Sequence, residues 1–383
     1  MNIADKDRAK VTTLVNNAVM ADEEAYDLVI NSMSIGINTL AANGALYDLA
    51  SMKYLSLEKP WWCKSIYSDL QINGHLLFTS GSLSPFYYYT PISFAYNKTL
   101  TDNYGITGLE DLVLAGKWTF DKMKSLATDC AADLDGNSKM DQNDQFAVCG
   151  GGSDQLFGFG LTMVSRTGPA SFEMNFEKSD FVDKLTKVAE FCSDKSIVFT
   201  DTDKTDVTLA MFREDKLMFY YTAMNNIITG YGSVESCRSM RSDYGILPIP
   251  KYDEAQEEYW TYGNPAGPNA IAVPITCSDP DRTSLIVETL AYYSYDYVKY
   301  AAYDSIVKSK ITRVEKTDQM LDILYSGVRF DLNSIFNFGG SRDICGACAR
   351  DIDSNITTQY AAIKSKAEAE LAQYIENLTS LQK

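Results

Sequence analysis

Short apolar runs alternate with segments of helical periodicity, and this alternation limits the fold more than any other feature of the chain. Residues 5–24 predict an amphipathic helix, because one face carries Val11, Leu14, Val15 and Ala18. The next segment, 25–30, predicts a short buried strand with Leu28, Val29 and Ile30 in a row. Further strands are predicted at 75–78, 145–152, 215–222, 244–250 and 270–274. Such a chain is expected to fold as an α/β protein with crossover connections.

Helix start signals support this pattern. Thr119 can cap a helix that runs to residue 127, and Asp279 can cap a helix with Pro280 at its first position. Residues 180–192 predict another helix. The chain ends in a long predicted helix from Asn355, whose apolar stripe carries Tyr360, Ile363, Ala367, Leu371, Tyr374, Leu378 and Leu381.

The length of the chain favours more than one core. A chain of 383 residues fits about two domains. Two βα modules leave a crevice between them, and ligands favour such crevices. This is a first, generic indication of a binding function.

Charge and hydropathy argue against several classes of function. The chain has 34 basic and 51 acidic residues, and its net charge of −17 argues against partners such as nucleic acid or anionic membranes. No run of 18 apolar residues predicts a membrane span. Tyrosine is over-represented at 25 residues, and its ring offers contact area with a polar tip.

Motifs for catalysis are scarce. His75 is the single histidine and lies in an apolar run, where a core or edge position is the simpler interpretation. The sequence has no G-x-S-x-G, H-E-x-x-H, Walker or G-x-G-x-x-G motif. Paired carboxylates for glycoside cleavage stay open, because the 51 acidic residues can meet in space. Cys345 and Cys348 form the one C-x-x-C, which fits a local disulfide, free thiols or a metal site.

An acidic loop at 132–146 carries oxygen-bearing side chains at regular offsets. Placed on the spacing of an EF-hand calcium loop, its ligand positions are Asp133, Asp135, Asn137, Lys139 (through its carbonyl), Asp141 and Asp144. Position 6 is Ser138 rather than glycine, and position 12 is aspartate rather than glutamate. Two interpretations stay open: a structural Ca²⁺ site, or a polar turn without metal. In either case the loop joins a helix that ends near Cys130 to the next strand.

Several stretches, taken in chain order, resemble one family. They are 25–52 ("AYDLVINSM…"), 57–84 ("LEKPWWCKSIYSDL…"), 94–106 ("FAYNKTLTDNYGI"), 116–148, 243–262 ("DYGILPIP…"), 270–274 ("AIAVP") and 303–324. The family is the extracellular solute-binding proteins of bacterial ABC importers, in the branch associated with sugars and oligosaccharides. Each motif alone is weak, whereas the ordered set covers nearly the whole chain.

The resemblance implies a type II periplasmic-binding-protein fold, in which two α/β lobes are joined by crossing hinge strands with a ligand cleft between them. It places the crossings near 95–97, 257–265 and 300–310. The first lobe is then expected to comprise 1–96 and 265–302, and the second lobe 97–264 and 303–383. At the second crossing Gly263, Pro265, Gly267 and Pro268 agree, since they prevent a helix from continuing.

The resemblance also implies a function. A protein of this kind has no enzymatic activity and no organic cofactor; it captures a small solute, here a sugar or oligosaccharide, by closing its lobes. It then delivers the solute to the permease subunits of an ABC transporter in the membrane. The resemblance implies a monomer at the cell surface, anchored as a lipoprotein. The alternative is a surface protein that binds or degrades glycans.

The start of the sequence departs from the family pattern. Such proteins begin with a signal peptide, a lipid-attachment cysteine and an initial strand, whereas this sequence begins where a later helix is expected. We therefore expect a truncated chain or an incomplete reading frame. The open sheet edge would make the first lobe less stable than the second. Proteolysis that cuts the second lobe first would contradict this expectation.

Candidate ligand residues follow strands that end at the cleft. Sites for sugars pair flat aromatic rings with a few amides, carboxylates and hydroxyls. From the first lobe the candidates are Ser34, Ile35, Ser80, Gly81 and Ser82. From the second lobe they are Tyr221, Thr222 and Asn225. Near the second crossing they are Trp260, Tyr262 and Asn264.

Other aromatic residues have simpler structural interpretations. Trp61 and Trp62 follow Pro60, and Trp118 opens a helix, so all three tryptophans are expected to serve the core. The run 87–89 is expected to alternate along a strand, with at most two of its tyrosines facing the cleft.

Overall fold

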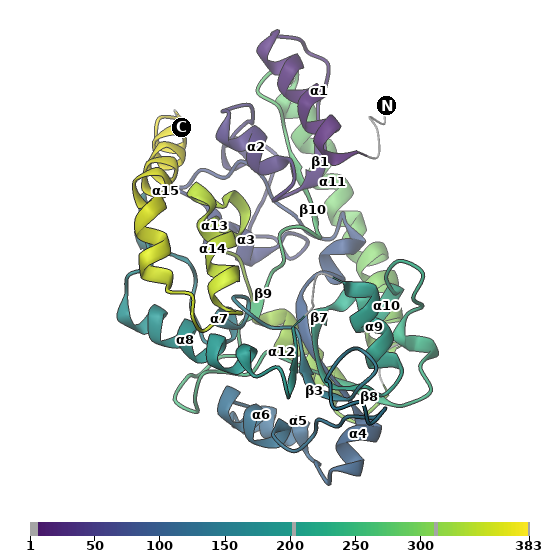
Figure 1. Cartoon of the computed structure of the whole chain (residues 1–383). Helices are drawn as coiled ribbons and strands as arrows, with labels where there is room; N and C mark the ends of the chain where they lie inside the picture. The colour runs from purple at the N-terminus through teal and green to yellow at the C-terminus, as the bar shows by residue number, and fades with distance from the viewer. Residues whose placement is uncertain (1–6, 201–203, 310–312, 382–383) are drawn as a thin grey trace.

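A computed structural model describes residues 7–200, 204–309 and 313–381 of the chain. Figure 1 shows two bodies arranged one above the other, with β1 and β10 in the upper body and β3, β7 and β8 in the lower. Among the described residues, no helix has the length and apolar character needed to cross a membrane.

The upper body is built on a two-stranded sheet. Its strands β1 (Val29–Ser32) and β10 (Asn269–Ala272) run antiparallel, with Ile30 opposite Ile271. Its helical elements are α1 (Arg8–Met20), α2 (Ile37–Ala42), η1 (Leu49–Ser51), α3 (Lys64–Leu70), η2 (Pro85–Tyr88) and α11 (Pro280–Lys299). The predicted cap of α11 is confirmed, since the Asp279 side chain accepts from the Arg282 amide.

The strand predicted at 75–78 is wrong, although the segment is buried. The Asp48 carboxylate accepts a hydrogen bond from the Leu76 amide at 2.9 Å and pairs with Nδ1 of His75 at 2.7 Å. These two polar groups are therefore satisfied by the Asp48 side chain and not by a strand ladder. The core position predicted for His75 is confirmed, because its side chain is buried.

Two further expectations for the upper body are corrected. Leu14 and Ile30 were expected to be buried, yet their side chains are 38% and 56% exposed. Both lie on elements whose other apolar residues, such as Val15 and Val29, do face the core. The tyrosines at 87–89 do not alternate along a strand. Pro85 opens the 3-10 turn η2 instead, because its fixed φ suits the first helical position.

The lower body holds a five-stranded mixed sheet of order β6-β3-β7-β2-β8. The strands are β2 (Ile92–Asn97), β3 (Phe146–Cys149), β6 (Val198–Phe199), β7 (Leu217–Ala223) and β8 (Tyr244–Leu247). β2 is antiparallel to both β7 and β8, whereas β3 is parallel to β6 and β7. Every residue of β2, β3 and β8 is buried, so these strands are covered on both faces of the sheet.

Helices surround this sheet. They are α4 (Lys98–Asn103), α5 (Leu109–Leu114), α6 (Phe120–Ala127), α8 (Ser179–Ser193), α9 (Thr205–Arg213), α10 (Met224–Thr229), η3 (Cys237–Ser239) and α12 (Thr317–Ser326). The cap predicted for α6 is confirmed, because the Thr119 hydroxyl accepts from the Lys122 amide at 3.2 Å. The core position of Trp118 is also confirmed: its ring is fully buried against Phe94 and Phe219.

Three chain segments meet between the bodies. β9 (Thr261–Tyr262) pairs in parallel with β11 (Val328–Arg329), and Pro91 forms a bridge with Gly263. The π-helical segment η4 (Tyr300–Lys308) continues α11. A short helix α7 (Gln155–Gly158) and a hairpin of β4 (Val164–Gly168) and β5 (Ser171–Met174) lie in the same region. The lobe boundaries stay a prediction.

The C-terminal elements pack against both bodies. They are α13 (Leu332–Phe336), η5 (Phe338–Gly340), α14 (Ser341–Cys348) and α15 (Ile356–Thr379). The Asn38 side chain of the upper body donates to the Ile335 carbonyl at 3.1 Å, and Lys364 of α15 forms an ion pair with Glu177. The long final helix was predicted correctly, and it buries Tyr360 on the predicted stripe. All eight cysteines are buried free thiols, so the C-x-x-C of α14 holds no disulfide.

Candidate functional site

A cavity of about 290 Å³ lies at one edge of the five-stranded sheet. The parallel strands β3 and β7 both end there, and the antiparallel β2 begins there. The cavity is therefore lined by residues that follow β3, by the last residues of β7 and by Ile92 at the start of β2. Loops beyond the carboxyl ends of parallel strands are where open α/β sheets bind ligands.

A glycine turn brings the chain after β3 close to β7. Gly150 has a φ of +91°, and a Cβ on it would lie 2.6 Å from the carbonyl oxygen of Tyr221. A side chain at this position would therefore push the two strand ends apart. The turn leads to Asp154, the residue before α7. Asp154 forms part of the cavity wall.

Two charged residues line the cavity. Asp154 immediately precedes α7, and Arg350 lies two residues beyond the end of α14. Burial raises the pKa of Asp154 to about 6, and the guanidinium groups of Arg350 and Arg342 oppose that rise. The cavity thus combines a carboxylate that resists ionisation with a nearby cation.

Hydroxyl and amide groups form the rest of the polar lining. Asn226 donates to the Thr222 hydroxyl at 2.9 Å, and the hydroxyls of Thr208 and Tyr220 pair at 3.1 Å. The Tyr221 hydroxyl differs from these, because it is buried and has no hydrogen-bond partner within the described parts of the chain. Burial raises the pKa of Tyr221 well above its ordinary value, with the nearby Asp154 as a further cause.

The structure brings three of the predicted ligand residues into this cavity: Tyr221, Thr222 and Asn264. The Asn225 side chain instead donates to Oδ1 of Asn226 at 3.0 Å. Tyr262 is buried against Phe157, with ring centroids 4.6 Å apart. A role in ligand binding stays a prediction for all of them.

The candidates from the upper body lie outside the cavity wall. Ser80 donates to the Asn269 carbonyl at 3.0 Å, and the Ser82 hydroxyl pairs with that of Tyr88 at 2.9 Å. Gly81 sits against the backbone of Trp61. Ser34 is half-buried and Ile35 is 47% exposed. Their contacts with ligand also stay predictions.

Trp260 lines a second hollow of about 240 Å³, separate from the cavity that holds Tyr221. The Arg329 guanidinium lies 5.3 Å from its ring centroid, and Phe172 and Asp69 line the same hollow. From the sequence we expected Trp260 and Tyr221 to line one cavity. The structure places them in two separate hollows.

Asp154 and Arg350 were missed from the sequence. A signal for Asp154 was present, because the predicted strand at 145–152 ends in three glycines and the acid follows two residues later. Arg350 had no comparable signal. It reaches the cavity only because α14 packs next to the glycine turn, with Nε of Arg350 3.4 Å from the position of a Cβ on Gly152.

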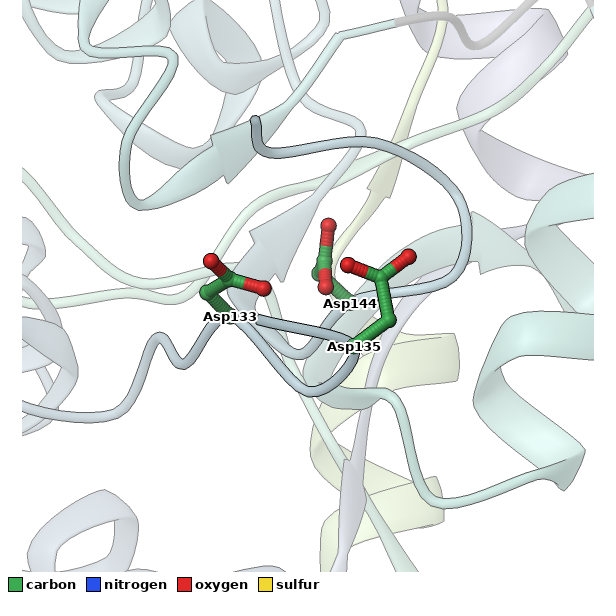
Figure 2. A group of neighbouring side chains, drawn as sticks. All are labelled: Asp133, Asp135 and Asp144. Atoms are coloured by element: carbon green, nitrogen blue, oxygen red, sulfur yellow. The ribbon is translucent and has the colours of Figure 1, made fainter. Parts of the chain in front are cut away.

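The acidic loop at 132–146 forms a compact turn on the lower body. Figure 2 shows the carboxylates of Asp133, Asp135 and Asp144 gathered on one side of the loop. One oxygen from each lies within 4.8 Å of the others. Hydrogen bonds from the amides of Asp141 and Leu134 hold the pKa of the buried Asp144 below its ordinary value.

This arrangement fits a calcium ion. Calcium–oxygen distances of about 2.4 Å place ligand oxygens on opposite sides of the ion about 4.8 Å apart, as these carboxylates allow. Ser138 has a φ of +61°, so it supplies the left-handed turn that glycine provides at position 6. Both oxygens of Asp133 accept backbone amides, from Gly136 and Ser138 at 2.7 Å each. Asn137, Lys139 and Asp141 stay predicted ligands.

The two bodies, the crossing segments and the cavity at the sheet edge define the class: the chain has the type II periplasmic-binding-protein fold predicted from the sequence. No family model and no curated protein matches the sequence. Solved structures do match, and they are substrate-binding proteins of ABC transporters and their relatives.

Three of these structures illustrate the likeness. The galacto-N-biose-/lacto-N-biose I-binding protein of the ABC transporter from Bifidobacterium longum is 13% identical, with a TM-score of 0.58 over 97% of this chain and 88% of its own. UgpB from Mycobacterium tuberculosis, in complex with glycerophosphocholine, is 15% identical, with a TM-score of 0.61 over 97% and 90%. The maltose/maltodextrin-binding domain MalE from Bdellovibrio bacteriovorus, bound to maltotriose, is 13% identical, with a TM-score of 0.54 over 97% and 89%. At these identities the likeness is one of fold.

Proposed function

We propose that this protein is the substrate-binding component of an ABC importer. It captures a small solute, a sugar or oligosaccharide, by closure of its two bodies and delivers it to permease subunits in the membrane. It carries out no reaction of its own and acts as a monomer. The same proposal places it outside the cell, held at the surface as a lipoprotein.

The observation that carries the proposal is the cavity at the edge of the lower sheet. It holds a buried Tyr221 hydroxyl without a partner in the described residues, together with the charged side chains of Asp154 and Arg350. A buried polar group without a partner destabilises a protein by about 1–3 kcal/mol. A ligand rich in hydroxyl groups supplies the missing hydrogen bonds. The proteins of matching fold support this, since the ligands in their structures include lacto-N-biose and maltotriose.

Closure follows from differential affinity. A ligand that contacts both bodies binds the closed form better than the open form and so shifts the population toward it. A nearly complete switch needs a preference of about 10⁴, or about 5.5 kcal/mol. The meeting of Pro91, Gly263 and Arg329 between the bodies gives short backbone connections at which such a motion can occur.

The test combines a binding screen with a measurement of shape. We expect at least one uncharged di- or trisaccharide to raise the melting temperature and to reduce the radius of gyration in small-angle scattering. The glycan itself should be recovered intact. Cleavage products would instead favour the alternative, a surface protein that degrades glycans. Binding without compaction would contradict capture by closure.

We also propose that the loop at 132–146 binds a structural Ca²⁺ ion. Its support is the convergence of Asp133, Asp135 and Asp144 and the left-handed Ser138. When bound, the ion would neutralise the three carboxylates and fasten the segment after α6 to β3. The loop precedes β3, whereas the cavity lies at the other end of that strand and shares none of the loop's residues, so the proposed role is structural.

A further inference from the structure

Asp154 has an unusual environment for a charged side chain. Its carboxylate lines the cavity, and among the described residues it has neither a hydrogen-bond partner nor an ion-pair partner. Asp154 is half-buried, and the buried carboxylate of Asp331 offers a comparison. Asp331 accepts hydrogen bonds from the amides of Val164 and Ser334, both at 3.0 Å, and so caps α13. Asp154 has no such structural task.

The Tyr221 hydroxyl is a second group without a partner in the same cavity. Its side chain is 7% exposed, and its oxygen is fully buried. One cavity therefore holds an acceptor and a hydroxyl that the described residues leave unsatisfied. Groups of this kind persist where a ligand completes them, because folding alone gains nothing from them.

We propose that Asp154 is a specificity-determining residue of the cleft: its carboxylate accepts hydrogen bonds from the hydroxyls of an uncharged ligand, and the Tyr221 hydroxyl completes the same contact. This inference rests on the proposed function and deepens it, since it names the ligand class. A carboxylate only accepts hydrogen bonds, so it selects for donors. A neighbouring phosphate or carboxylate on the ligand would be repelled.

The titratable and charged groups that face Asp154 come from three elements. They are Arg342, Cys345 and Arg350 of the α14 region, Tyr221 of β7 and Tyr262 of β9. The two arginines favour the ionised carboxylate, whereas burial disfavours it and raises the pKa of Asp154 to about 6. At neutral pH the carboxylate is ionised and ready to accept.

Ligand binding and folding then depend on pH in opposite directions. Hydroxyl donors bind the ionised carboxylate, so affinity is full well above pH 6, is about half at pH 6 and falls further below it. The unliganded protein behaves in the reverse way. Because the folded pKa lies above the ordinary value of 3.8, the stability linked to Asp154 is complete below about pH 4 and is lost as the pH rises through 6. A side chain that weakens the fold at neutral pH is retained for binding.

The experiment compares the wild type with Asp154→Asn and with the matched control Asp331→Asn. Isothermal titration at pH 5.0, 6.0 and 7.5 uses a panel of uncharged di- and trisaccharides that includes maltotriose and lacto-N-biose, with glycerol 3-phosphate as an anionic probe. For the wild type we expect Kd to rise about tenfold from pH 7.5 to pH 5.0, with about half of the affinity already lost at pH 6.0. Asp154→Asn should weaken binding at least tenfold at pH 7.5 and remove the pH dependence. Asp331→Asn should keep the wild-type affinity at pH 7.5 and the wild-type pH dependence.

Melting of the unliganded proteins gives an independent readout. Asp154→Asn should raise the melting temperature by about 2–4 °C at pH 7.5 and by about half as much at pH 5.0. A lower melting temperature at pH 7.5 would show a structural role and overturn the inference. Unchanged affinity of Asp154→Asn would also overturn it, as would a preference of the wild type for glycerol 3-phosphate over every uncharged probe. Failure of the wild type to bind any probe overturns the proposed function and this inference together.

Discussion

The glycine turn after β3 gives a sharp test of how the cavity is built. We predict that Gly150→Ala destabilises the protein and weakens ligand binding, because the added methyl group has no room. Its Cβ would lie 2.6 Å from the carbonyl oxygen and 2.9 Å from the Cβ of Tyr221. Neither atom belongs to the flexible end of a side chain, so the strand ends themselves must separate.

Gly151 provides a matched control within the same turn. Its φ is +96°, close to the +91° of Gly150, but a Cβ on it would have nothing within 4 Å. Both alanine variants pay for a left-handed backbone, which is about 1–2 kcal/mol for a residue with a Cβ. Only Gly150→Ala adds overpacking, about 1–3 kcal/mol. We therefore expect losses of about 2–5 kcal/mol for Gly150→Ala and about 1–2 kcal/mol for Gly151→Ala.

Urea unfolding followed by circular dichroism measures both losses, and titration with the best glycan of the screen measures the effect on binding. Separation of the turn from Tyr221 also moves Asp154 away from the Tyr221 hydroxyl. Gly150→Ala should therefore weaken binding at least tenfold. Gly151 lines the cavity itself, so Gly151→Ala is the control for stability alone. Equal stability losses for the two variants would refute the reasoning, since the backbone strain alone would then account for both.

Three other outcomes follow from the structure. Calcium in excess over chelator should raise the melting temperature, and Asp133→Ala should abolish the response; an unchanged melting temperature in the wild type would remove the calcium site. Trp118→Ala should destabilise the protein by about 3–5 kcal/mol in guanidinium unfolding, because the ring is fully buried and its Nε1 donates to the Pro248 carbonyl at 3.0 Å; a loss below about 1 kcal/mol would contradict its core role. Burial raises the pKa of Asp331 to about 6, above its ordinary value of 3.8, so its stabilising effect is complete below about pH 4 and is lost as the pH rises through 6. Asp331→Asn should flatten that part of the stability profile measured between pH 4 and pH 7.

The sequence predicted the elements whose cause is local. The helix cap at Thr119, the cap at Asp279 and the stripe of the final helix depend on residues a few positions apart, and all three are confirmed. The strand at 75–78 failed for a different reason. The Leu76 amide and the His75 side chain bond to Asp48, which lies 27 to 28 residues away in sequence, and periodicity within the run contains no sign of such a partner.

The residues that line the cavity also fall into those that the sequence could predict and those that it could not. Tyr221 and Thr222 could be found because they end a strand, and strand ends are where ligands bind in α/β folds. Arg350 could not, since its approach depends on how α14 packs beside the turn. Trp260, which precedes β9, lines the other hollow because of the tertiary path of the chain and not because of a local pattern; its contact with ligand stays a prediction.

The position of Trp260 gives the molecule a built-in optical signal. Nε1 atoms of Trp61 and Trp62 are fixed by Glu288 at 3.1 and 2.9 Å, and Trp118 is enclosed in the lower sheet, so their emission is a steady background. Trp260 alone lies in a hollow whose walls come from α3, from the β4–β5 hairpin and from the segment after β11. Any rotation of these walls alters the solvent and the charge around one indole, and an unlabelled sample in a fluorimeter reports it.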